Sequence, residues 1–151
     1  MTTVGEMCER DVVVATPEMT VSEAANLMRS RHVGSLVVVS NMNGGSRVPV
    51  SIVTDRDLVV EVTAVDLDPK AITIGDIMPR RLFTVRADEG PLEAIHIMRS
   101  KGVRRLPVLN DQGRLLGLVA FDDLLAVIAG ELGALTRVVD LERSREATTR
   151  R

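Results

Sequence analysis

The sequence predicts a mixed α/β (α+β) fold built from two similar halves. Of the 151 residues, 45% are hydrophobic, which is enough for one compact domain or for two small units that share a core. Short β-branched runs alternate with segments of helical periodicity, a pattern typical of mixed folds. The whole pattern occurs twice along the chain.

The duplication becomes visible when the sequence is shifted against itself by 70 places. Residues 4–40 then align with residues 74–110, and ten of these 37 pairs are identical. Past Asn41 the offset falls to 66, because the loop at 41–47 is longer than the loop at 111–113. A unit of this size exceeds a solenoid repeat and is small for an independent domain. We therefore expect two half-modules that pack against each other.

Each half opens with a signal for a short capped helix, at Thr3 and at Thr73. In both places a Thr is followed three residues later by an acidic residue. Short strands are expected next, at 12–15 in the first half and 82–85 in the second.

A longer helix follows each of these strands. Thr20 and Glu23 form a capping box in the first half, and Pro91 occupies the first helical position in the second. The apolar residues that follow recur at helical spacing, so each helix should bury one face, with its methionines in the core. Gly102 ends the second helix and His32 the first, both at a position that favours left-handed backbone. We interpret His32 as a cap, although a ligand contact stays open.

Two strands that could form a hairpin come next in each half: residues 35–39 with 48–53, and 105–109 with 114–119. The connections contain turn residues, including Gly44 and Gly45. These glycines lack the pattern of a phosphate-binding loop and are interpreted as a turn. Pro107 indicates an edge or strand-start position for its strand.

A final helix follows each hairpin. The first is predicted at 55–64. The second carries an apolar stripe from Leu124 to Val138, is interrupted by Gly130 and Gly133, and ends in a charged segment. An apolar stripe of that length needs a cover. We therefore expect a homodimer that forms through the terminal helices.

The composition excludes several functions. Lys plus Arg number 19 against 21 for Asp plus Glu, so the net charge of -2 provides no general field for nucleic acid. Phe83 and Phe121 are the only aromatic residues, too few for base-stacking platforms. Cys8 is the only cysteine, which predicts a reducing cytoplasm and no Cys/His zinc cluster. The apolar runs fall far short of the roughly 18 residues of a membrane span.

The junction between the last strand and last helix of the first half, residues 51–58, is the best candidate for a ligand site, and it recurs in degraded form at 117–124. It exposes a hydroxyl, backbone N–H groups and a carboxylate at one point. Thr54 and Asp57 can also be a plain capping box, which helix formation alone would explain. Asp123 survives where the capping Thr has been lost, which favours a separate role for its carboxylate, though Asp also suits a helix N-terminus.

The order strand, helix, strand, strand, helix, given twice with this junction, strongly resembles the cystathionine β-synthase (CBS) domain, two of which form a Bateman module. The motifs that carry the resemblance are Ile52 to Leu58, Gly34 to Val38 and Val103 to Val108. The resemblance implies a first domain at 4–65 and a second at 74–132, related by a pseudo-twofold axis. A helix extension and charged tail at 133–151 follow. Because nearly the whole chain is covered, a stand-alone protein without a catalytic domain is expected.

The resemblance also implies two clefts that bind adenosine-containing compounds such as AMP, ADP, ATP, NAD or S-adenosylmethionine. In such families the helix-start Asp holds the ribose hydroxyls, a role that maps to Asp57 and Asp123. The hydroxyl near phosphate maps to Thr54. The basic residues before the Leu-Pro segment map to Arg104 and Arg105, for which a salt bridge or a solvated position remains an alternative.

The expected adenine wall is aliphatic and consists of Val13, Val33 and Ile52. The first half lacks the basic pair and has Gly34 and Ser35 there instead, and these two residues are also expected to contact the ligand. Ser51 departs from the usual glycine of the motif, and Ala120 from its hydroxyl. The two clefts should therefore differ, and one of them could be empty.

Three classes of function remain. The leading hypothesis is a regulatory sensor with an adenine nucleotide as ligand, no obligatory cofactor or metal, and an unidentified regulated protein as partner. The alternative is a ligand-independent dimeric scaffold. An enzyme is not expected, because the sequence has no Gly-x-Ser-x-Gly, His-Glu-x-x-His or P-loop signature.

Overall fold

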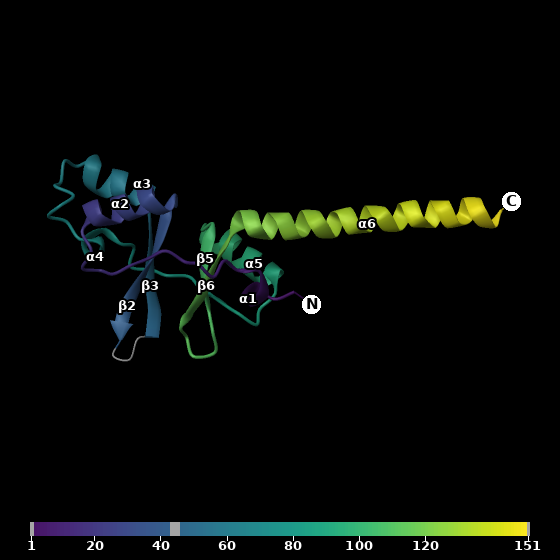
Figure 1. The fold of residues 1–151 in the computed structure, drawn as a ribbon, viewed down its shortest axis with the longest axis horizontal. Helices are drawn as coiled ribbons and strands as arrows, with labels where there is room; N and C mark the ends of the chain where they lie inside the picture. The colour runs from purple at the N-terminus through teal and green to yellow at the C-terminus, as the bar shows by residue number, and fades with distance from the viewer. Residues whose placement is uncertain (1, 43–45, 151) are drawn as a thin grey trace.

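The computed structural model describes residues 2–42 and 46–150 and contains one three-stranded sheet in each half of the chain (Figure 1). The strands are β1 (Val14–Ala15), β2 (Ser35–Met42) and β3 (Ser46–Thr54) in the first sheet, and β4 (Val85–Arg86), β5 (Arg105–Leu109) and β6 (Leu115–Ala120) in the second. In both sheets the middle strand pairs in parallel with the first strand and antiparallel with the third. The predicted mixed fold is confirmed. The turn residues Gly44 and Gly45 lie outside the described residues.

The helices are α1 (Val4–Met7), α2 (Val21–Arg31), α3 (Asp55–Leu58), the π-helix η1 (Val59–Thr63), α4 (Ile74–Ile77), α5 (Pro91–Lys101) and α6 (Phe121–Thr149). The α2 capping box is confirmed: the N–H of Thr20 donates to Glu23 at 2.9 Å, and the N–H of Glu23 donates to Thr20 Oγ1 at 3.1 Å. His32 (φ 54°) and Gly102 (φ 67°) end their helices in the left-handed region, as predicted. The helix expected at 55–64 begins as α3 and continues as η1.

Two details of the sequence prediction are wrong. Pro107 lies within β5, the middle strand of its sheet, and not at an edge. The equivalent residue of the first sheet, Val37, donates its N–H to the carbonyl of Val13 at 3.2 Å, a bond that proline cannot make. Pro107 is tolerated because this position lies beyond the end of the two-residue β4, which pairs only with Val108 and Leu109. The terminal helix α6 also runs without interruption through Gly130 and Gly133, although each glycine costs about 1 kcal/mol relative to Ala.

The short helices α1 and α4 are exchanged between the halves. The N–H of Val4 in α1 donates to the carbonyl of Glu89 in the second half at 2.8 Å. The N–H of Ile74 in α4 donates in the equivalent way to the carbonyl of Met19 in the first half, also at 2.8 Å. Both apolar side chains are fully buried, Val4 in the second core and Ile74 in the first. Each leading helix therefore completes the core of the other half, which ties the two halves together.

The long helices α2 and α5 bury one face each, as their periodicity predicts. Ala24 and Met28 of α2 lie in the first core. Ala94 and Met98 of α5 occupy the equivalent places in the second core. The methionines are therefore core residues.

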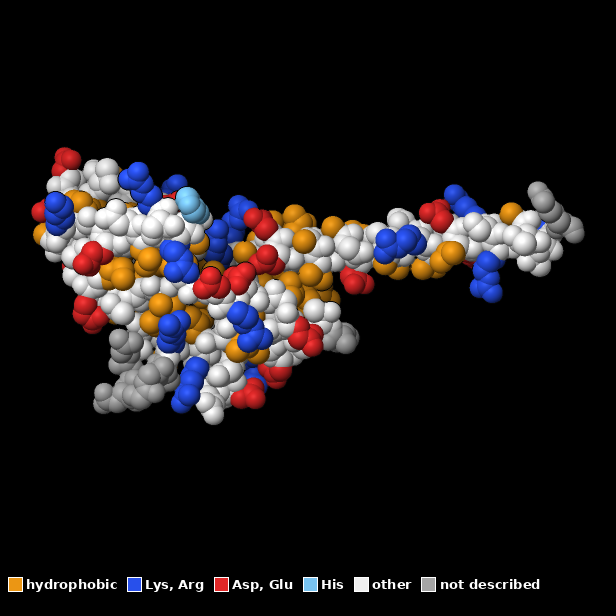
Figure 2. Space-filling view, viewed as in Figure 1, with side chains coloured by type: hydrophobic (Ala, Val, Ile, Leu, Met, Phe, Trp, Pro, Cys, Tyr) orange, Lys and Arg blue, Asp and Glu red, His pale blue; other side chains and the backbone are white. Residues whose placement is uncertain are grey.

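The terminal helix α6 extends away from both sheets and continues far beyond the second half (Figure 1). Its first turn buries Leu124 in the second core. Further along, six large apolar side chains are 47–64% exposed: Leu125, Leu132, Leu135, Val138, Val139 and Leu141. Figure 2 shows apolar side chains along the projecting part of this helix. No helix of the described residues has the length and apolar character that crossing a membrane requires.

Candidate functional site

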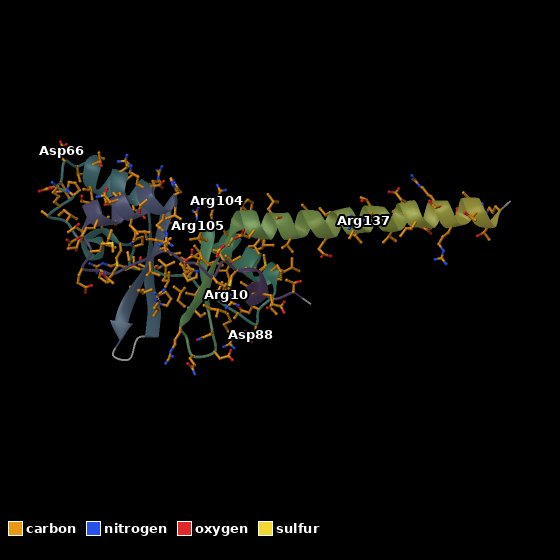
Figure 3. All side chains as sticks on the ribbon, viewed as in Figure 1. Arg10, Asp66, Asp88, Arg104, Arg105 and Arg137 are labelled. Atoms are coloured by element: carbon orange, nitrogen blue, oxygen red, sulfur yellow. The ribbon has the colours of Figure 1, made fainter. Side chains whose placement is uncertain are left out.

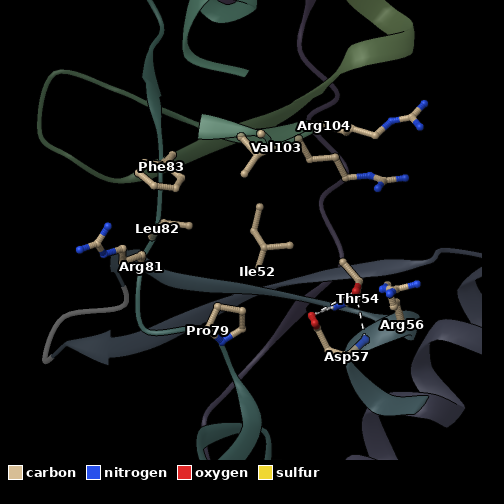
Figure 4. Close-up of a pocket in the computed structure, with 12 residues that line it drawn as sticks. Ile52, Thr54, Arg56, Asp57, Pro79, Arg81, Leu82, Phe83, Val103 and Arg104 are labelled. Carbon is tan, nitrogen blue, oxygen red and sulfur yellow. Dashed lines mark hydrogen bonds between the residues drawn. The ribbon is translucent and has the colours of Figure 1, made fainter. Parts of the chain in front are cut away.

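A cavity of about 560 Å³ lies between the two halves (Figure 4). The first half contributes the junction of β3 with α3, and the second half contributes the segment before β4 and the turn between α5 and β5. The lining residues are Ile52, Thr54, Arg56, Asp57, Pro79, Arg81, Leu82, Phe83, Gly102, Val103, Arg104 and Arg105. This cavity, called the first cleft below, has the volume of a typical small-molecule site.

Thr54 and Asp57 form the capping box of α3 on the wall of the first cleft. Oδ2 of Asp57 accepts hydrogen bonds from the Thr54 N–H at 2.8 Å and from the Thr54 hydroxyl at 3.1 Å. The N–H of Asp57 donates back to Thr54 Oγ1 at 3.3 Å (Figure 4). Among the described residues, Oδ1 of Asp57 has no hydrogen-bond partner. The cap therefore fixes the carboxylate and leaves one of its oxygens able to accept from a ligand.

Four arginines line the first cleft: Arg56, Arg81, Arg104 and Arg105. Figure 4 shows Arg56 and Arg104 on the side of Thr54, and Arg81 beyond the apolar residues on the opposite side. With Asp57 as the one acidic lining residue, the cleft has a positive potential that favours an anion. The sequence prediction missed Arg56 and Arg81, although Arg56 stands inside the junction motif itself.

Arg104 and Arg105 lie where the two halves meet (Figure 3). Arg104 is 3.7 Å from a carboxylate oxygen of Asp122, and its guanidinium lies 5.3 Å from the ring centroid of Phe121. Both members of the ion pair are mostly exposed, 73% and 83%, so the pair is weak and leaves Arg104 able to meet an anion. Among the described residues Arg105 has no ion-pair partner.

The apolar wall of the first cleft is formed by Ile52, Leu82, Phe83 and Val103 (Figure 4). Phe83 offers an aromatic face on which a planar base can stack. The sequence prediction had grouped Val13 and Val33 with Ile52 around one adenine, but only Ile52 lines this cleft. The signal for Phe83 was present, because the 70-place shift aligns it with Val13.

A smaller cavity of about 280 Å³ is the counterpart of the first cleft across the repeat. Its lining residues are Glu9, Asp11, Val12, Val13, His32, Val33, Gly34, Ser35, Arg105 and Leu118. Apart from Arg105, the repeat aligns each of them with a residue that lines the first cleft. In this second cleft the first half contributes the segment before β1 and the turn between α2 and β2, and the second half contributes β6 and Arg105 of β5. The predicted residues Val13, Val33, Gly34 and Ser35 thus lie in a different cavity from Thr54 and Asp57.

Asp123 lines neither cleft. Its Oδ2 accepts the N–H of Ala120 at 2.9 Å, so it caps α6 in the way that Asp57 caps α3. Asp123, which the resemblance assigns to the ribose, therefore does not line either cleft. His32, in contrast, both ends α2 and lines the second cleft.

The ionisable side chains whose pKa is shifted do not line either cleft. Hydrogen bonds from the backbone and hydroxyl of Thr73 lower the pKa of Asp76, and burial raises the pKa of the Cys8 thiol. Among the described residues, no group of three or more His, Cys, Asp and Glu side chains could hold a metal ion. The chemistry that the clefts present is thus recognition by charge, hydrogen bonding and apolar contact.

A family model for the CBS domain matches residues 4–64 and again residues 74–130. The chain belongs to the CBS domain family. The two matches correspond to the two halves of the fold, so the protein contains a CBS domain pair, which is a regulatory module.

Two relatives show how far the similarity reaches. An uncharacterized protein of Methanopyrus kandleri is 39% identical over 124 residues, which are 82% of this chain and 61% of that protein. The chain thus spans less than two thirds of that relative. The inosine-5'-monophosphate dehydrogenase of Methanocaldococcus jannaschii is 30% identical over 120 residues, but only 22% of the enzyme is covered. That similarity concerns the CBS portion and carries no evidence of catalysis.

Solved structures share the same fold. A CBS-domain protein of Agrobacterium tumefaciens has a TM-score of 0.71 and 26% identity, and the match covers 83% of this chain and 98% of that one. The CBS domain pair of protein MJ0100, solved with 5-methylthioadenosine and S-adenosyl-L-methionine, has a TM-score of 0.71 at 24% identity, covering 87% and 98%. At that identity the second structure shows the fold alone.

Proposed function

We propose that this CBS pair is a regulatory sensor that binds an adenosine nucleotide in the first cleft. One observation carries the proposal: a fixed carboxylate, an apolar wall with an aromatic face, and arginines all line one cavity of suitable size. Asp57 accepts hydrogen bonds from the ribose hydroxyls, and the base lies between Ile52 and Phe83. Arg104 and Arg105 pair with the phosphate.

The position of the first cleft supports a regulatory role. Residues from both halves line it, so a ligand there favours the arrangement of the halves that fits it best. A partner protein that binds one arrangement more tightly than the other would read the change. The Thr54 hydroxyl stands beside the predicted phosphate position and holds Asp57 in place. The cytoplasmic location expected from the single cysteine stays a prediction.

Thermal unfolding against AMP, ADP, ATP, NAD and S-adenosylmethionine tests the proposal. A ligand present at 100 times its dissociation constant adds about 2.7 kcal/mol to the free energy of unfolding. For a chain of this size the unfolding midpoint should rise by about 5–10 °C. A nucleotide that raises the midpoint selectively identifies the ligand class, and no shift with any of the five contradicts the sensor.

The chain offers a matched pair of variants for this experiment. Asp57→Asn and Asp123→Asn each weaken the cap of one helix, but only Asp57 lines the first cleft. We expect Asp57→Asn to weaken nucleotide binding by about tenfold to a hundredfold, because a hydrogen bond to a charged group is lost. Asp123→Asn should leave the affinity unchanged. An equal loss in both variants would show that helix capping, and not ribose contact, is what matters.

The terminal helix favours a second function, a homodimeric scaffold. Its apolar residues Leu125, Ile128, Leu132, Leu135 and Val139 follow one another at alternating spacings of three and four. That heptad pattern is typical of a helix that supercoils with a partner helix. A second copy of α6 presents the same row and can cover it.

Analytical ultracentrifugation tests the dimer. Leu132→Glu places a charge within the row and should shift the protein toward the monomer. Arg137→Glu, five residues further along and two residues after Leu135, points away from the row by heptad position and serves as the control (Figure 3). A wild-type protein that is monomeric at micromolar concentration would contradict the scaffold and leave the sensor untouched.

A further inference from the structure

One wall of the first cleft is held by fewer bonds than its counterpart in the second half of the repeat. This wall consists of residues 79–83, which precede β4 and line one side of the cleft (Figure 4). The 70-place shift aligns them with residues 9–13, which line the second cleft in the same way. The bonds that hold the two walls can therefore be compared position by position.

The wall at 9–13 is fixed to β6 by a backbone bridge. The N–H of Glu9 donates to the carbonyl of Leu118 at 2.9 Å, and the N–H of Leu118 donates back at 2.9 Å. Pro79 stands in the place of Glu9 in the first half and has no N–H, so the first of these bonds cannot form there. Among the described residues, no such bridge joins Pro79 to Ile52, the counterpart of Leu118.

A second proline removes an anchor at the other end of the wall. The carbonyl of Val13 accepts a hydrogen bond from the N–H of Val37 at 3.2 Å. Pro107 takes the place of Val37 in the second sheet, so it cannot donate to the carbonyl of Phe83, which is the counterpart of Val13. The backbone at 79–83 therefore lacks bonds at both ends that its counterpart makes.

The side chains add to this difference. Asp11 lies 3.4 Å from a guanidinium nitrogen of Arg31, and the repeat replaces these two residues by Arg81 and Lys101. An attractive pair thus becomes two cations, which repel each other. The ammonium group of Lys101 lies 5.4 Å from the ring centroid of Phe83, a contact that contributes little at an exposed site.

Ser51 supplies the bond that the wall at 79–83 has instead. Its fully buried hydroxyl donates from β3 to the carbonyl of Pro79 at 2.7 Å. Gly117, the counterpart of Ser51, has no side chain that could do the same. We propose that residues 79–83 are a movable wall that closes on the ligand of the first cleft, and that Ser51 is the positioning residue that tethers this wall.

The wall carries two of the groups that a nucleotide would meet. Phe83 offers the stacking face, and Arg81 adds positive charge. A ligand that orders the wall loses part of its binding free energy to that ordering. Because the tether limits the positions that the free wall can take, it reduces this loss and raises the affinity. The inference rests on the proposed function to the extent that it takes a nucleotide as the ligand.

NMR relaxation of the backbone amides tests the wall in the free, full-length chain. Order parameters report motion on the ps–ns scale, and relaxation dispersion reports motion on the μs–ms scale. We expect the amides of residues 80–83 to be more mobile than those of residues 10–13, and saturating AMP to reduce the difference. Equal mobility of the two segments in the free protein, or a difference that bound AMP leaves unchanged, overturns the proposal.

Matched variants test the role of the tether. Ser51→Ala removes the hydroxyl, so the mobility of residues 80–83 should rise, that of residues 10–13 should stay the same, and AMP should bind about twofold to tenfold more weakly. Ser51→Gly, with the residue that the second half carries there, should have the same effects. Thr20→Ala is the control, because it removes a capping hydrogen bond of α2 at a similar cost in stability but lies outside both clefts. An equal loss of AMP affinity in Thr20→Ala, or a rise in mobility throughout the chain in Ser51→Ala, contradicts the positioning role.

The outcomes separate the inference from the proposed function. AMP binding that depends on Asp57, with equal mobility of the two walls, leaves the sensor standing and removes the inference. A mobile wall at 79–83 that depends on Ser51, in a chain that binds no nucleotide, leaves the tethered wall standing and removes the sensor.

Discussion

The two halves of the molecule pack the last strand of their sheets in different ways. In the first half the fully buried Ser51 donates a hydrogen bond from its hydroxyl to the carbonyl of Pro79 at 2.7 Å. In the second half Gly117 holds the equivalent place, where a Cβ would lie 2.5 Å from Cys8 Sγ and 2.6 Å from the carbonyl oxygen of Glu9. The departure of Ser51 from the glycine of the motif is therefore compensated by a hydrogen bond. An internal duplication can keep its fold while its contacts diverge.

Gly117→Ala should have the largest effect on this comparison. A methyl group there must displace the backbone of residues 8–9, and such overpacking costs about 1–3 kcal/mol. The midpoint of thermal unfolding should fall by about 2–4 °C for each kcal/mol. Differential scanning calorimetry measures the change. An unchanged midpoint would show that the second half has more room than the structure indicates.

Ser51→Gly is the matched change in the first half. It removes one buried hydrogen bond and restores the residue that the second half carries, so we expect a loss of about 1 kcal/mol. Urea denaturation of the wild type and both variants gives the free energies of unfolding on one scale. A larger loss of unfolding free energy for Ser51→Gly than for Gly117→Ala would show that the buried hydrogen bond of the first half contributes more to stability than the close packing at Gly117.

The walls of the two clefts give a second comparison. Phe83 lines the first cleft, and Val13 takes its place in the second. Phe83→Leu should weaken nucleotide binding by about fivefold or more, because base stacking contributes about 1–3 kcal/mol. Val13→Leu should leave the nucleotide affinity unchanged. Fluorescence or calorimetric titrations decide between them, and equal effects of the two changes would contradict the assignment of the base to the first cleft.

The cap of the exchanged helix α4 should weaken in acid. In α4 the N–H and hydroxyl of Thr73 donate to Asp76 at 2.9 and 3.0 Å, which lowers the pKa of Asp76. Because the folded pKa lies below the unfolded value, the stabilisation is present near neutral pH and is lost as the pH falls through the folded pKa. NMR titration should show the Asp76 carboxyl titrating below the same residue in an unfolded peptide. A midpoint at or above that of the peptide contradicts the cap.

The fold could be predicted from the sequence wherever the signal is local. The capping box at Thr20 and the left-handed position of His32 are properties of a few neighbouring residues, and both are confirmed. The internal repeat supported the order of the elements, because the same local pattern occurs twice in the sequence. The position of Pro107 in a middle strand was missed, since it depends on how far β4 extends in space.

The site was harder to predict, because it depends on which segments from distant parts of the sequence lie next to each other in the fold. Nothing local to Val4 or Ile74 says that each helix packs on the other half, and that exchange brings the halves together. Val13 and Ile52 both suit an adenine wall by composition, yet they line different cavities. Applying the 70-place shift to Val13 would have pointed to Phe83.

A crystal structure of the full chain grown with AMP tests the central claim most directly. The account predicts the ribose at Asp57, the base against Phe83 and the phosphate beside Arg104 and Arg105, all in the first cleft. AMP bound in the second cleft, or bound in the first cleft without contact to Asp57, would contradict it.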